Sequence, residues 1–484
     1  MTTIEYDRLY IGGEWVSPSD ASVIDVRSPA TEELVGRVPN GRNADIDRAV
    51  EAARAAFDDP NGWPRWDPEK RAKALLRFAF ALESRGAEMA RRVTIQNGMP
   101  IWLSEAWEAN NPATLLRYYS DLIVEQDDEL RQGIKGKQTL VTREPLGVVA
   151  AIVPWNVPQG ITFLKLAPAL AAGCTVVLKP APETVLDAFL VAEAAIEAGL
   201  PAGVLNIVPA AGETGSYLVQ HPGIDKVSFT GSPEVGRMIG ETCGRLLRPV
   251  TLELGGKSAA IVLDDADLPG NIEKLFASTM VNNGQVCWLS TRILAPQNQY
   301  DKTVQLVTDM VSGLRVGDPL DHDTKIGPLV SEKHRERVEG LVARGIAQGG
   351  RLTTGGKRPK GFDRGWFFEP TVFADVGRKD LLAQKEIFGP VLTVIPYSDE
   401  QDAIEIANDS DYGLAGSVWT SDDERGLRVA RQVKTGTIGI NGYATDPVAP
   451  FGGVKSSGLG RELGPEGLNH YQALKSIFLN RPNA

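Results

Sequence analysis

Residues 147–153, GVVAAIV, and residues 175–179, TVVLK, are two apolar runs on either side of a helical stretch, 163–172, that ends at Gly173. Continuous apolar runs of this length are typical of strands that are covered on both faces of a sheet. The alternation continues downstream, with strands predicted at 204–208, 226–230 and 250–254 and helices at 183–198, 213–220 and 233–243. Because strands that alternate with helices form right-handed βαβ crossovers, this stretch predicts a doubly wound parallel sheet.

A second alternating series follows the first and extends to residue 440. Its strands are predicted at 259–263, 292–295, 391–396, 417–419 and 437–440, and its helices at 267–281, 302–312, 331–347 and 400–407. Outside the two series, residues 9–16 predict a hairpin around Gly12-Gly13, and 138–143 and 476–480 predict two more strands. The expected fold class is therefore α/β, with two doubly wound domains and a small additional β element.

The composition is that of an ordinary globular protein, since 42% of the 484 residues are hydrophobic and 23% are charged. The 51 Lys and Arg residues against 62 Asp and Glu residues give a net charge of −11. No nucleic-acid partner is expected, because phosphate binding requires a basic face. The most apolar region, 146–178, is interrupted by prolines and by Lys165, so no membrane partner is expected either.

The three cysteines, Cys174, Cys243 and Cys287, are too few for a disulfide framework, and none belongs to a CxxC pair. With only four histidines and no HxxxH pair, no metal site is expected. The first ten residues lack the apolar core of a signal peptide. A reducing compartment fits this cysteine usage, and the expected location is the cytoplasm.

Polar or glycine-rich clusters follow four strands of the first series. They are Pro154-Trp155-Asn156, Lys179-Pro180, Phe229-Thr230-Gly231-Ser232 and Glu253-Leu254-Gly255-Gly256-Lys257. Open α/β sheets bind ligands at the carboxyl ends of their strands, and glycine at a helix N-terminus lets backbone N–H groups approach a phosphate. Each cluster alone could be a plain turn, but four on successive strands predict a ligand site at this edge.

A set of longer motifs in a fixed order makes a family resemblance specific. The motifs are PWN (154–156), KP (179–180), FTGS (229–232), LELGGK (252–257), GQVC (284–287), EIFGP (386–390), PFGGVKSSG (450–458) and GRELG (460–464). With these motifs the chain resembles the aldehyde dehydrogenase superfamily, in its hydrolytic, NAD(P)-dependent form. The resemblance implies a Rossmann-like cofactor domain, a catalytic domain and oxidation of an aldehyde to a carboxylic acid.

The resemblance implies a role for each of five catalytic residues. Cys287 would attack the aldehyde to give a thiohemiacetal, which loses hydride to the nicotinamide and leaves a thioester for hydrolysis. Asn156 and the backbone N–H of Cys287 would stabilise the alkoxide, and Glu253, 34 residues before the cysteine, would activate water. Lys165 and Glu462 match positions that relay the proton, with a surface ion pair as the alternative interpretation of both. Cys174 and Cys243 are expected to be inert buried thiols.

The cofactor positions also follow from the resemblance. Lys179 would hold the adenine ribose, Glu386 the nicotinamide ribose, and Phe388 would pack beside it. The remaining positions are Ile152, Val153, Pro154, Trp155, Gly215, Phe229, Gly231, Ser232, Val235, Leu254, Gly255 and His334; an exposed helix histidine is an equally good interpretation of the last. Pro182 stands where NAD-preferring relatives often carry a ribose-binding Glu, so NADP is possible, but no extra cation beside Lys179 clamps a phosphate and NAD is favoured.

The substrate positions implied by the resemblance are mostly apolar: Val157, Gly160, Ile161, Leu164, Val281, Val286, Trp288, Thr445 and Phe451. Because no Arg or Lys is among them, we expect an uncharged aldehyde, with Gly160 and Val157 leaving room for bulk. The expected domains are 1–122 with 146–254 for the cofactor and 255–448 for catalysis. Residues 123–145 and 449–484 would form an oligomerisation element and tail that build a homodimer or homotetramer by strand addition.

Two other functions remain as alternatives. A CoA-acylating aldehyde dehydrogenase would pass the acyl group to CoA instead of water, but the carboxylate at Glu253 favours hydrolysis. A catalytically idle relative that binds nucleotide would be expected to lack Cys287 or Glu253, and both residues are present.

Overall fold

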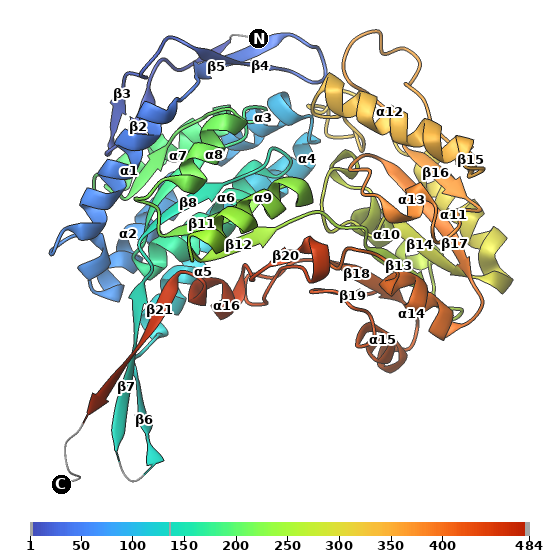
Figure 1. The fold of residues 1–484 in the computed structure, drawn as a ribbon. Coiled ribbons are helices and arrows are strands. Elements are labelled where there is room, and N and C mark those ends of the chain that lie inside the picture. The colour runs from blue at the N-terminus through green and yellow to red at the C-terminus, as the bar shows by residue number, and fades with distance from the viewer. Residues whose placement is uncertain (1–2, 135–136, 480–484) are drawn as a thin grey trace.

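The structure, a computed structural model, describes residues 3–134 and 137–479 of the chain. Two large sheets stand side by side, each with helices packed against it, and a long β arm projects away from the first (Figure 1). The first sheet has the strand order β20-β12-β11-β8-β9-β10-β2-β3. Its strands are β2 (Leu9–Ile11), β3 (Glu14–Val16), β8 (Val148–Ile152), β9 (Thr175–Lys179), β10 (Leu205–Ile207), β11 (Lys226–Thr230), β12 (Val250–Glu253) and β20 (Gly458–Leu459).

The five central strands of this sheet, from β12 to β10, are parallel, and the strands at both edges are antiparallel. Alternate residues of β8 face two separate cores, with Val149 and Ala151 in one and Val148 and Ala150 in the other. Side chains of α2 (Pro68–Glu83), α5 (Asn111–Glu125), α6 (Pro158–Ala172) and α7 (Leu186–Glu197) complete the first core. The second core is completed by α1 (Asn43–Asp58), α8 (Gly212–Gln220) and α9 (Pro233–Arg245).

The second sheet has the order β15-β16-β17-β14-β13-β18-β19, and only β15 runs antiparallel to its neighbour. Its strands are β13 (Ala259–Val262), β14 (Arg292–Pro296), β15 (Arg351–Thr354), β16 (Thr371–Ala374), β17 (Val391–Tyr397), β18 (Gly416–Trp419) and β19 (Gly439–Ile440). Its helices are α10 (Ile272–Thr279), α11 (Tyr300–Ser312), α12 (Glu332–Ala347), α13 (Leu381–Gln384), α14 (Glu400–Asn408) and α15 (Asp423–Ala430). The two sheets confirm the predicted α/β class with two doubly wound units.

Two small sheets complete the fold. One is formed by β1 (Ile4–Glu5), β5 (Leu34–Pro39) and β4 (Val23–Arg27). The other is the arm of Figure 1, in which β7 (Gln138–Pro145) pairs with both β6 (Glu129–Gln132) and β21 (Gln472–Leu479), all antiparallel. The two strands predicted at 138–143 and 476–480 are therefore partners, with Leu140 opposite Ile477, although Asn480 lies outside the described residues.

Several boundaries differ from those expected. Helix α6 begins at Pro158, five residues early, because proline is well tolerated in the first turn of a helix. The helix predicted at 267–281 shrinks to α10, since a 3₁₀ turn at Pro269–Asn271 precedes it. The expected hairpin at 9–16 is confirmed, with Gly12 and Gly13 in left-handed conformations at its turn. No helix within residues 3–134 and 137–479 is both long and apolar enough to cross a membrane.

Candidate active site

Cys287 lies in a loop between the two sheets. Hydrogen bonds from the Asn283 side chain to neighbouring backbone hold this loop in place. Asn282 and Asn283 adopt left-handed conformations in the 3₁₀ turn Asn282–Gly284, just before the cysteine. The Asn283 side-chain amide donates to the carbonyl oxygens of Gly98 and Pro328, both at 2.9 Å. Its oxygen accepts from the Gly327 N–H at 2.6 Å. These three hydrogen bonds fix the turn that presents the thiol.

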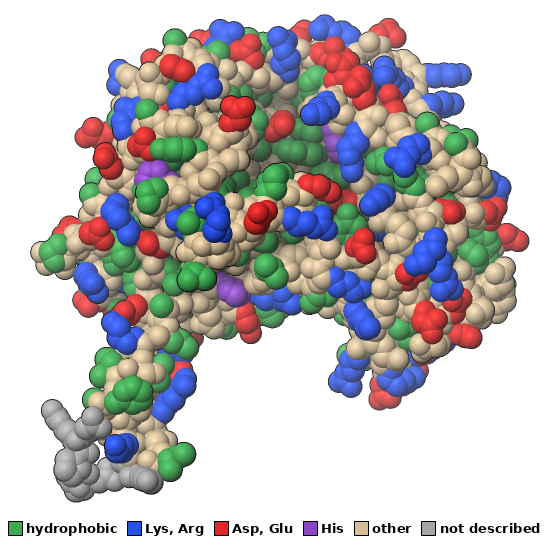
Figure 2. Space-filling view, viewed as in Figure 1, with side chains coloured by type: hydrophobic (Ala, Val, Ile, Leu, Met, Phe, Trp, Pro, Cys, Tyr) green, Lys and Arg blue, Asp and Glu red, His purple; other side chains and the backbone are tan. Residues whose placement is uncertain are grey.

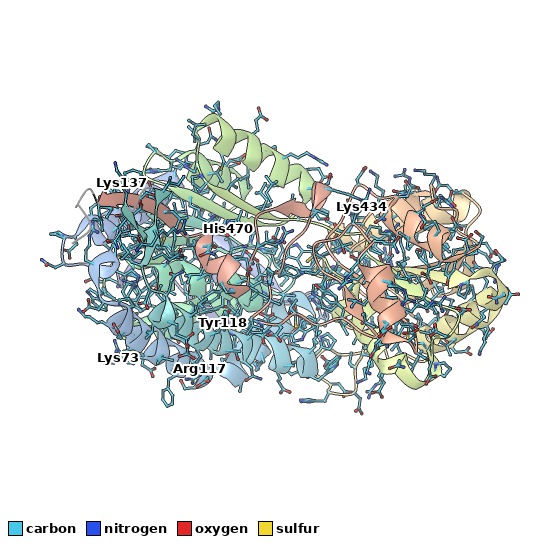
Figure 3. All side chains as sticks on the ribbon, turned by 90° about the horizontal axis from the view of Figure 1, so that it is seen from below. Lys73, Arg117, Tyr118, Lys137, Lys434 and His470 are labelled. Carbon is cyan, nitrogen blue, oxygen red and sulfur yellow. The ribbon has the colours of Figure 1, made fainter. Side chains whose placement is uncertain are left out.

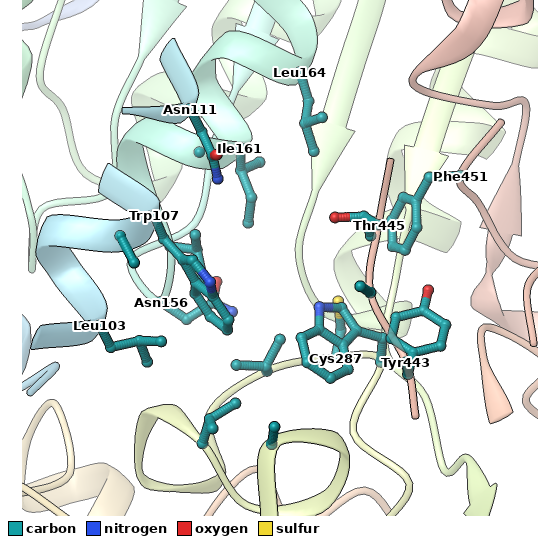
Figure 4. Close-up of a pocket in the computed structure, with 18 of the residues that line it drawn as sticks. Leu103, Trp107, Asn111, Asn156, Ile161, Leu164, Cys287, Tyr443, Thr445 and Phe451 are labelled. Carbon is teal, nitrogen blue, oxygen red and sulfur yellow. The ribbon is translucent and has the colours of Figure 1, made fainter. Parts of the chain in front are cut away.

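The Cys287 thiol is half-buried and faces a cavity of about 890 Å³ (Figure 4). Burial, and then the Glu386 and Glu253 carboxylates, raise the pKa of this thiol well above its ordinary range. This environment therefore favours the protonated thiol over the thiolate. Nucleophilic attack requires that its proton be removed, since the thiolate is the reactive form.

Asn156 lies beside the cysteine loop and is almost fully buried. Its side-chain Nδ2 donates to the carbonyl oxygen of Gln285 at 2.9 Å, and its own carbonyl oxygen accepts from Asn282 Nδ2 at 2.9 Å. Figure 4 shows Asn156 and Cys287 on the same cavity, with Asn156 on the side of the first sheet. One amide N–H of Asn156 is thus engaged with the loop, and the other has no acceptor among residues 3–134 and 137–479.

Glu253 ends β12 and lines the same cavity. It is 2% exposed, and neither carboxylate oxygen has a hydrogen-bond partner among the described residues. Burial, and then the neighbouring Glu462 carboxylate, hold the pKa of Glu253 well above its ordinary value. A buried carboxylate without partners is costly, which marks this residue as one that acts on something bound in the cavity.

Lys165 and Glu462 form an ion pair with 2.5 Å between Nζ and Oε1. Both side chains are buried, at 0% and 2% exposed, so the surface ion pair considered from the sequence is wrong. Lys165 also donates to the Thr230 hydroxyl at 2.7 Å. The pair therefore connects α6, the end of β11 and the segment that follows β20.

Lys179 ends β9 and has a nearly buried side chain. Its Nζ donates to the Pro180 carbonyl oxygen at 3.2 Å, and a Cβ on Gly215 would lie 3.2 Å from its Cε. Burial, opposed by the Glu183 carboxylate, lowers the pKa of Lys179 to about 8. The Ser232 hydroxyl caps α9 by accepting from the Val235 N–H at 3.3 Å.

The other predicted cofactor positions surround these strand ends. Backbone hydrogen bonds hold Val153 to β9, Gly231 to β12 and Leu254 to Ser457, and the Ser457 hydroxyl donates to the Gly255 carbonyl oxygen. Ile152 and Phe229 are buried, and Pro154 is half-buried. Figure 2 shows a hollow in this face of the molecule, with hydrophobic side chains inside it and charged side chains around its rim. Glycines and a capped helix N-terminus beside a buried lysine suit the phosphates and ribose of a dinucleotide.

Glu386 precedes β17 of the second sheet, and its Oε1 accepts from the Gly256 N–H at 2.9 Å. Burial, offset in part by that N–H, raises the pKa of Glu386 to about 7. Trp155 packs edge-on against Phe388 and His334, with 5.4 Å between ring centroids in both pairs. His334 is not an exposed helix residue, because its Nε2 lies 2.6 Å from the Phe388 carbonyl oxygen and burial lowers the pKa of this imidazole to about 4.

The nine positions predicted for the substrate all line the cavity at Cys287. Gly160 does not leave room there, however, because a Cβ on it would lie 2.8 Å from Cγ1 of Val157, which already fills that space. The cavity also has a lysine that the predicted set lacked. Lys325 is exposed, and its Nζ lies 4.9 Å from the centroid of a Trp102 ring.

A model of the aldehyde dehydrogenase family matches residues 15–477. The chain belongs to the aldehyde dehydrogenase family. It is 52% identical over 478 residues to the geranial dehydrogenase of Castellaniella defragrans, with 99% of each chain covered. It is 41% identical over 486 residues to a phenylacetaldehyde dehydrogenase of Pseudomonas fluorescens, with 98% of this chain and 95% of the relative covered. A crystal structure of a Mycobacterium tuberculosis aldehyde dehydrogenase complexed with NAD+ has a TM-score of 0.97 and 50% identity, covering 100% of both chains.

These relationships make the chain an NAD-dependent aldehyde dehydrogenase. Several residues that line the cavity of this aldehyde dehydrogenase carried no motif in the sequence. They are Trp102, Leu103, Trp107, Asn111, Phe276, Met310, Leu314 and Tyr443. Trp102 and Trp107 come from α4 (Ile101–Ser104) and the π-helical turn Glu105–Ala109, which follow α3 (Gly86–Asn97). Only the density of tryptophan in this stretch could have drawn attention to it.

Proposed function

We propose that this enzyme oxidises uncharged, apolar aldehydes to carboxylic acids by a hydrolytic thioester mechanism. One observation supports this most directly: a largely apolar cavity of about 890 Å³ holds the Cys287 thiol and the unpartnered Glu253 carboxylate together. A thiol can form the acyl intermediate, and a carboxylate with a raised pKa can serve as a base near neutral pH.

In the first half of the proposed reaction, Cys287 Sγ attacks the aldehyde carbon and its proton passes to Glu253. The free N–H of Asn156 and the backbone N–H of Cys287 stabilise the oxygen that becomes negative. Bound NAD+ accepts the hydride. The apolar walls of the cavity keep bulk water away from the thioester before the hydrolysis step.

In the second half, Glu253 removes a proton from the water that attacks the thioester. Its two free oxygens leave it able to bind that water, and its elevated pKa makes it basic enough to deprotonate it. Glu253 must first pass the thiol proton to the buried pair of Lys165 and Glu462. After the water attacks, the C–S bond breaks, the carboxylic acid leaves, and the Cys287 thiolate takes back a proton. A general base at this position favours water over CoA as acyl acceptor.

The residues at the strand ends fit the cofactor. Lys179 and the capped N-terminus of α9 would hold the adenosine diphosphate half, and Glu386 would accept hydrogen bonds from the nicotinamide ribose. We place residues 1–122 and 146–254 in the cofactor domain and 255–448 in the catalytic domain. We expect NAD to be preferred over NADP, because the Glu183 carboxylate acts on Lys179 where a 2′-phosphate would have to fit.

The named relatives help to define the substrate. The relative at 52% identity is a geranial dehydrogenase, and another at 41% is a phenylacetaldehyde dehydrogenase. Both aldehydes are apolar, in keeping with a cavity whose walls carry Trp102, Trp107, Trp288 and Phe451. We propose aldehydes of terpenoid or arylalkyl size, and we place the enzyme in the cytoplasm, where its three free cysteines would remain reduced.

The test is NAD reduction with geranial, phenylacetaldehyde and succinate semialdehyde, with and without CoA, for the native chain and for Cys287→Ala. Reduction without CoA that disappears in Cys287→Ala is expected, with the highest kcat/KM for an apolar aldehyde. A higher kcat/KM for succinate semialdehyde would overturn the substrate class. Reduction that requires CoA would instead establish the acylating reaction.

A further inference from the structure

The segment that carries Asn156 is neither strand nor helix. Strand β8 ends at Ile152 and α6 begins at Pro158, and the residues just before α6 form a bend. Pro154 and Pro158 have no N–H groups with which to hold the segment. Among the described residues, the carbonyl oxygens of Trp155 and Asn156 accept hydrogen bonds only from side-chain amides. The direction of the Asn156 side chain therefore depends on residues outside the segment.

Asn97, the last residue of α3, supplies two of these hydrogen bonds. Its Nδ2 donates to the carbonyl oxygens of Trp155 and Asn156, both at 3.2 Å. Its Oδ1 accepts from the Met99 N–H at 2.9 Å, and only 1% of the residue is exposed. A side-chain amide has two N–H groups and one oxygen, so these three contacts use both ends of it. The buried Asn97 side chain is thus held in a single orientation.

The loop that carries Cys287 holds Asn156 from the other side. Asn282 Nδ2 donates to the Asn156 carbonyl oxygen at 2.9 Å, so this oxygen accepts from two side-chain amides. The Asn156 side chain in turn donates to the Gln285 carbonyl oxygen at 2.9 Å. Asn156 is therefore fixed by α3 of the first α/β unit and by the cysteine loop of the second.

Gly98 closes a ring of hydrogen bonds among three segments. Its carbonyl oxygen accepts from Asn283 Nδ2 at 2.9 Å, while the neighbouring Asn97 binds the segment of Asn156. Gly98 has φ of +81°, and a Cβ on it would lie 2.7 Å from the Pro328 carbonyl oxygen. Residues 97–98, 155–156 and 282–283 are thus each bonded to the other two. Figure 3 shows the two units side by side from below, with side chains packed between them.

The chemistry of the site creates a need for such a ring. In the proposed mechanism the negative oxygen is stabilised by the Asn156 side chain, from the first unit, and by the Cys287 backbone N–H, from the second. Each donor is effective only when it lies about 2.7–3.1 Å from that oxygen. A misplacement of about 1 Å can lower a rate about a hundredfold. The position of the first unit relative to the second at this point therefore determines the rate.

We propose that Asn97 is a positioning residue that sets the place of the Asn156 amide relative to the Cys287 N–H. Asn97 is not among the residues that line the cavity, so it acts on the reaction through Asn156 and not by touching the substrate. The inference rests on the proposed mechanism, in which Asn156 stabilises the negative oxygen. A residue that served the fold alone would affect stability without acting through Asn156, and this difference can be measured.

A double-mutant cycle with NAD+ and geranial tests whether Asn97 acts through Asn156. Asn156→Ala should lower kcat about a hundredfold or more, because it removes a donor to the negative oxygen. Asn97→Ala should lower kcat about tenfold, because that donor is then displaced. The double variant should be no slower than Asn156→Ala, since Asn97 then has no amide to position.

Asn206→Ala is the matched control for Asn97→Ala. Asn206 is a fully buried asparagine on β10 whose Nδ2 donates to the Val176 and Gly203 carbonyl oxygens and whose Oδ1 accepts from the Gly12 N–H. Each variant therefore loses two side-chain donors to backbone carbonyls and one acceptor, and both should lower the melting temperature. Only Asn97→Ala should slow NADH formation in the first turnover. The KM for NAD should change less than about twofold in both variants.

Native kcat in Asn97→Ala, or an equal loss of kcat in Asn206→Ala, would overturn the proposal. A double variant about tenfold slower than Asn156→Ala would also overturn it, because the two effects would then be independent. If Asn97→Ala does not fold, Asn97→Asp decides, since it has the same shape and an oxygen for the Met99 N–H but no amide N–H. Native kcat in Asn156→Ala would instead defeat the oxyanion role in the proposed mechanism itself, and the role of Asn97 with it.

Discussion

Glu253 is a buried carboxylate without a hydrogen-bond partner in the part of the chain that the structure describes, and its environment determines how the rate should depend on pH. Because its pKa is raised, the basic form of Glu253 increases as the pH rises through a range above that of an ordinary carboxylate. The rate of thioester hydrolysis should therefore rise with pH through the pKa of Glu253. Glu253→Gln should lower kcat about a hundredfold or more and remove this dependence, as measured by kcat from pH 5 to 9.

The first turnover separates this role from a structural one. Glutamine has the same shape but cannot accept the Cys287 proton, so Glu253→Gln should still bind NAD with native affinity, while NADH formation in the first turnover slows together with kcat. A variant that keeps both native kcat and the native pH profile would show that another group activates the water.

Glu183 is an exposed carboxylate whose field acts on Lys179. A 2′-phosphate on the adenine ribose would be repelled by this charge, whereas a 2′-hydroxyl would not. Glu183→Gln should raise kcat/KM for NADP about two- to fivefold, which is the size of effect expected from a surface charge interaction. The value of kcat/KM for NAD should remain nearly unchanged. Glu213→Gln, at another exposed carboxylate in the first turn of α8, is the control. Equal effects of the two variants would indicate that the change in kcat/KM comes from the net charge of the protein and not from the position of Glu183.

At the residue scale, local motifs pointed to residues that the structure brings together on one cavity, and the distant contacts were missed. A recognisable sequence motif surrounds each of Cys287, Glu253 and Asn156. The structure places all three residues on one cavity. Trp107 and Glu108 carried no such signal. Their importance comes from contacts with α6 and Trp288 that only the folded chain creates.

At the scale of the element, the start of α6 depends on a carboxyl group from another segment. Glu108 Oε2, in the π-helical turn, accepts from the N–H groups of Gln159 at 2.6 Å and Gly160 at 3.3 Å. Such N–H groups have no partner within their own helix. Burial, which these hydrogen bonds only partly offset, raises the pKa of Glu108 to about 8. Buried Asp187, hydrogen-bonded to Gln159, adds repulsion.

A carboxyl group with a raised folded-state pKa favours folding only while it is protonated. Below its unfolded value of about 4.5 that contribution is complete, and it is lost as the pH rises to about 8. The melting temperature of the native chain should therefore fall from pH 5 to pH 8 more steeply than that of Glu108→Gln, which stays neutral. Glu108→Ala should be less stable than both by about 1–3 kcal/mol at every pH, because two buried N–H groups lose their acceptor.

The comparison of Glu108→Gln with the native chain removes the contribution of all other titrating groups. Parallel melting curves for these two proteins across this range would show that Glu108 is ionised at pH 5 already and would contradict the assigned environment. Calorimetry at a fixed scan rate is the measurement, because a chain with two large sheets can unfold irreversibly.

Elements with a clear hydrophobic period were predicted well and short ones were not. The strands of the first sheet are continuous apolar runs, and β8, β9 and β11 lie within two residues of their expected ends. The 3₁₀ turn at Pro269–Asn271 and the π-helical turn at Glu105–Ala109 have no sequence period of their own. Strands β15 and β16 were missed because their pairing, not their local pattern, makes them strands.

At the scale of the whole molecule, the arm exposes several large apolar side chains on neighbouring strands. Leu474 and Phe478 on β21 are 66% and 73% exposed, and Leu130 on β6 is 53% exposed. Figure 1 shows the arm standing clear of both large sheets. Exposed apolar residues on an antiparallel edge are typical of a surface that another subunit covers. We therefore expect a homodimer or homotetramer assembled through this arm.

Leu474→Asp with Phe478→Asp should dissociate this assembly, because each change would bury a charge against apolar surface in the interface. Deletion of residues 474–484 should have the same effect, since it removes most of β21. Light scattering should report a smaller particle for both variants. Phe80→Asp, at a 68% exposed phenylalanine on α2 far along the chain from the arm, should keep the native mass. A native mass in the arm variants would mean that the chain is a monomer or associates through another face.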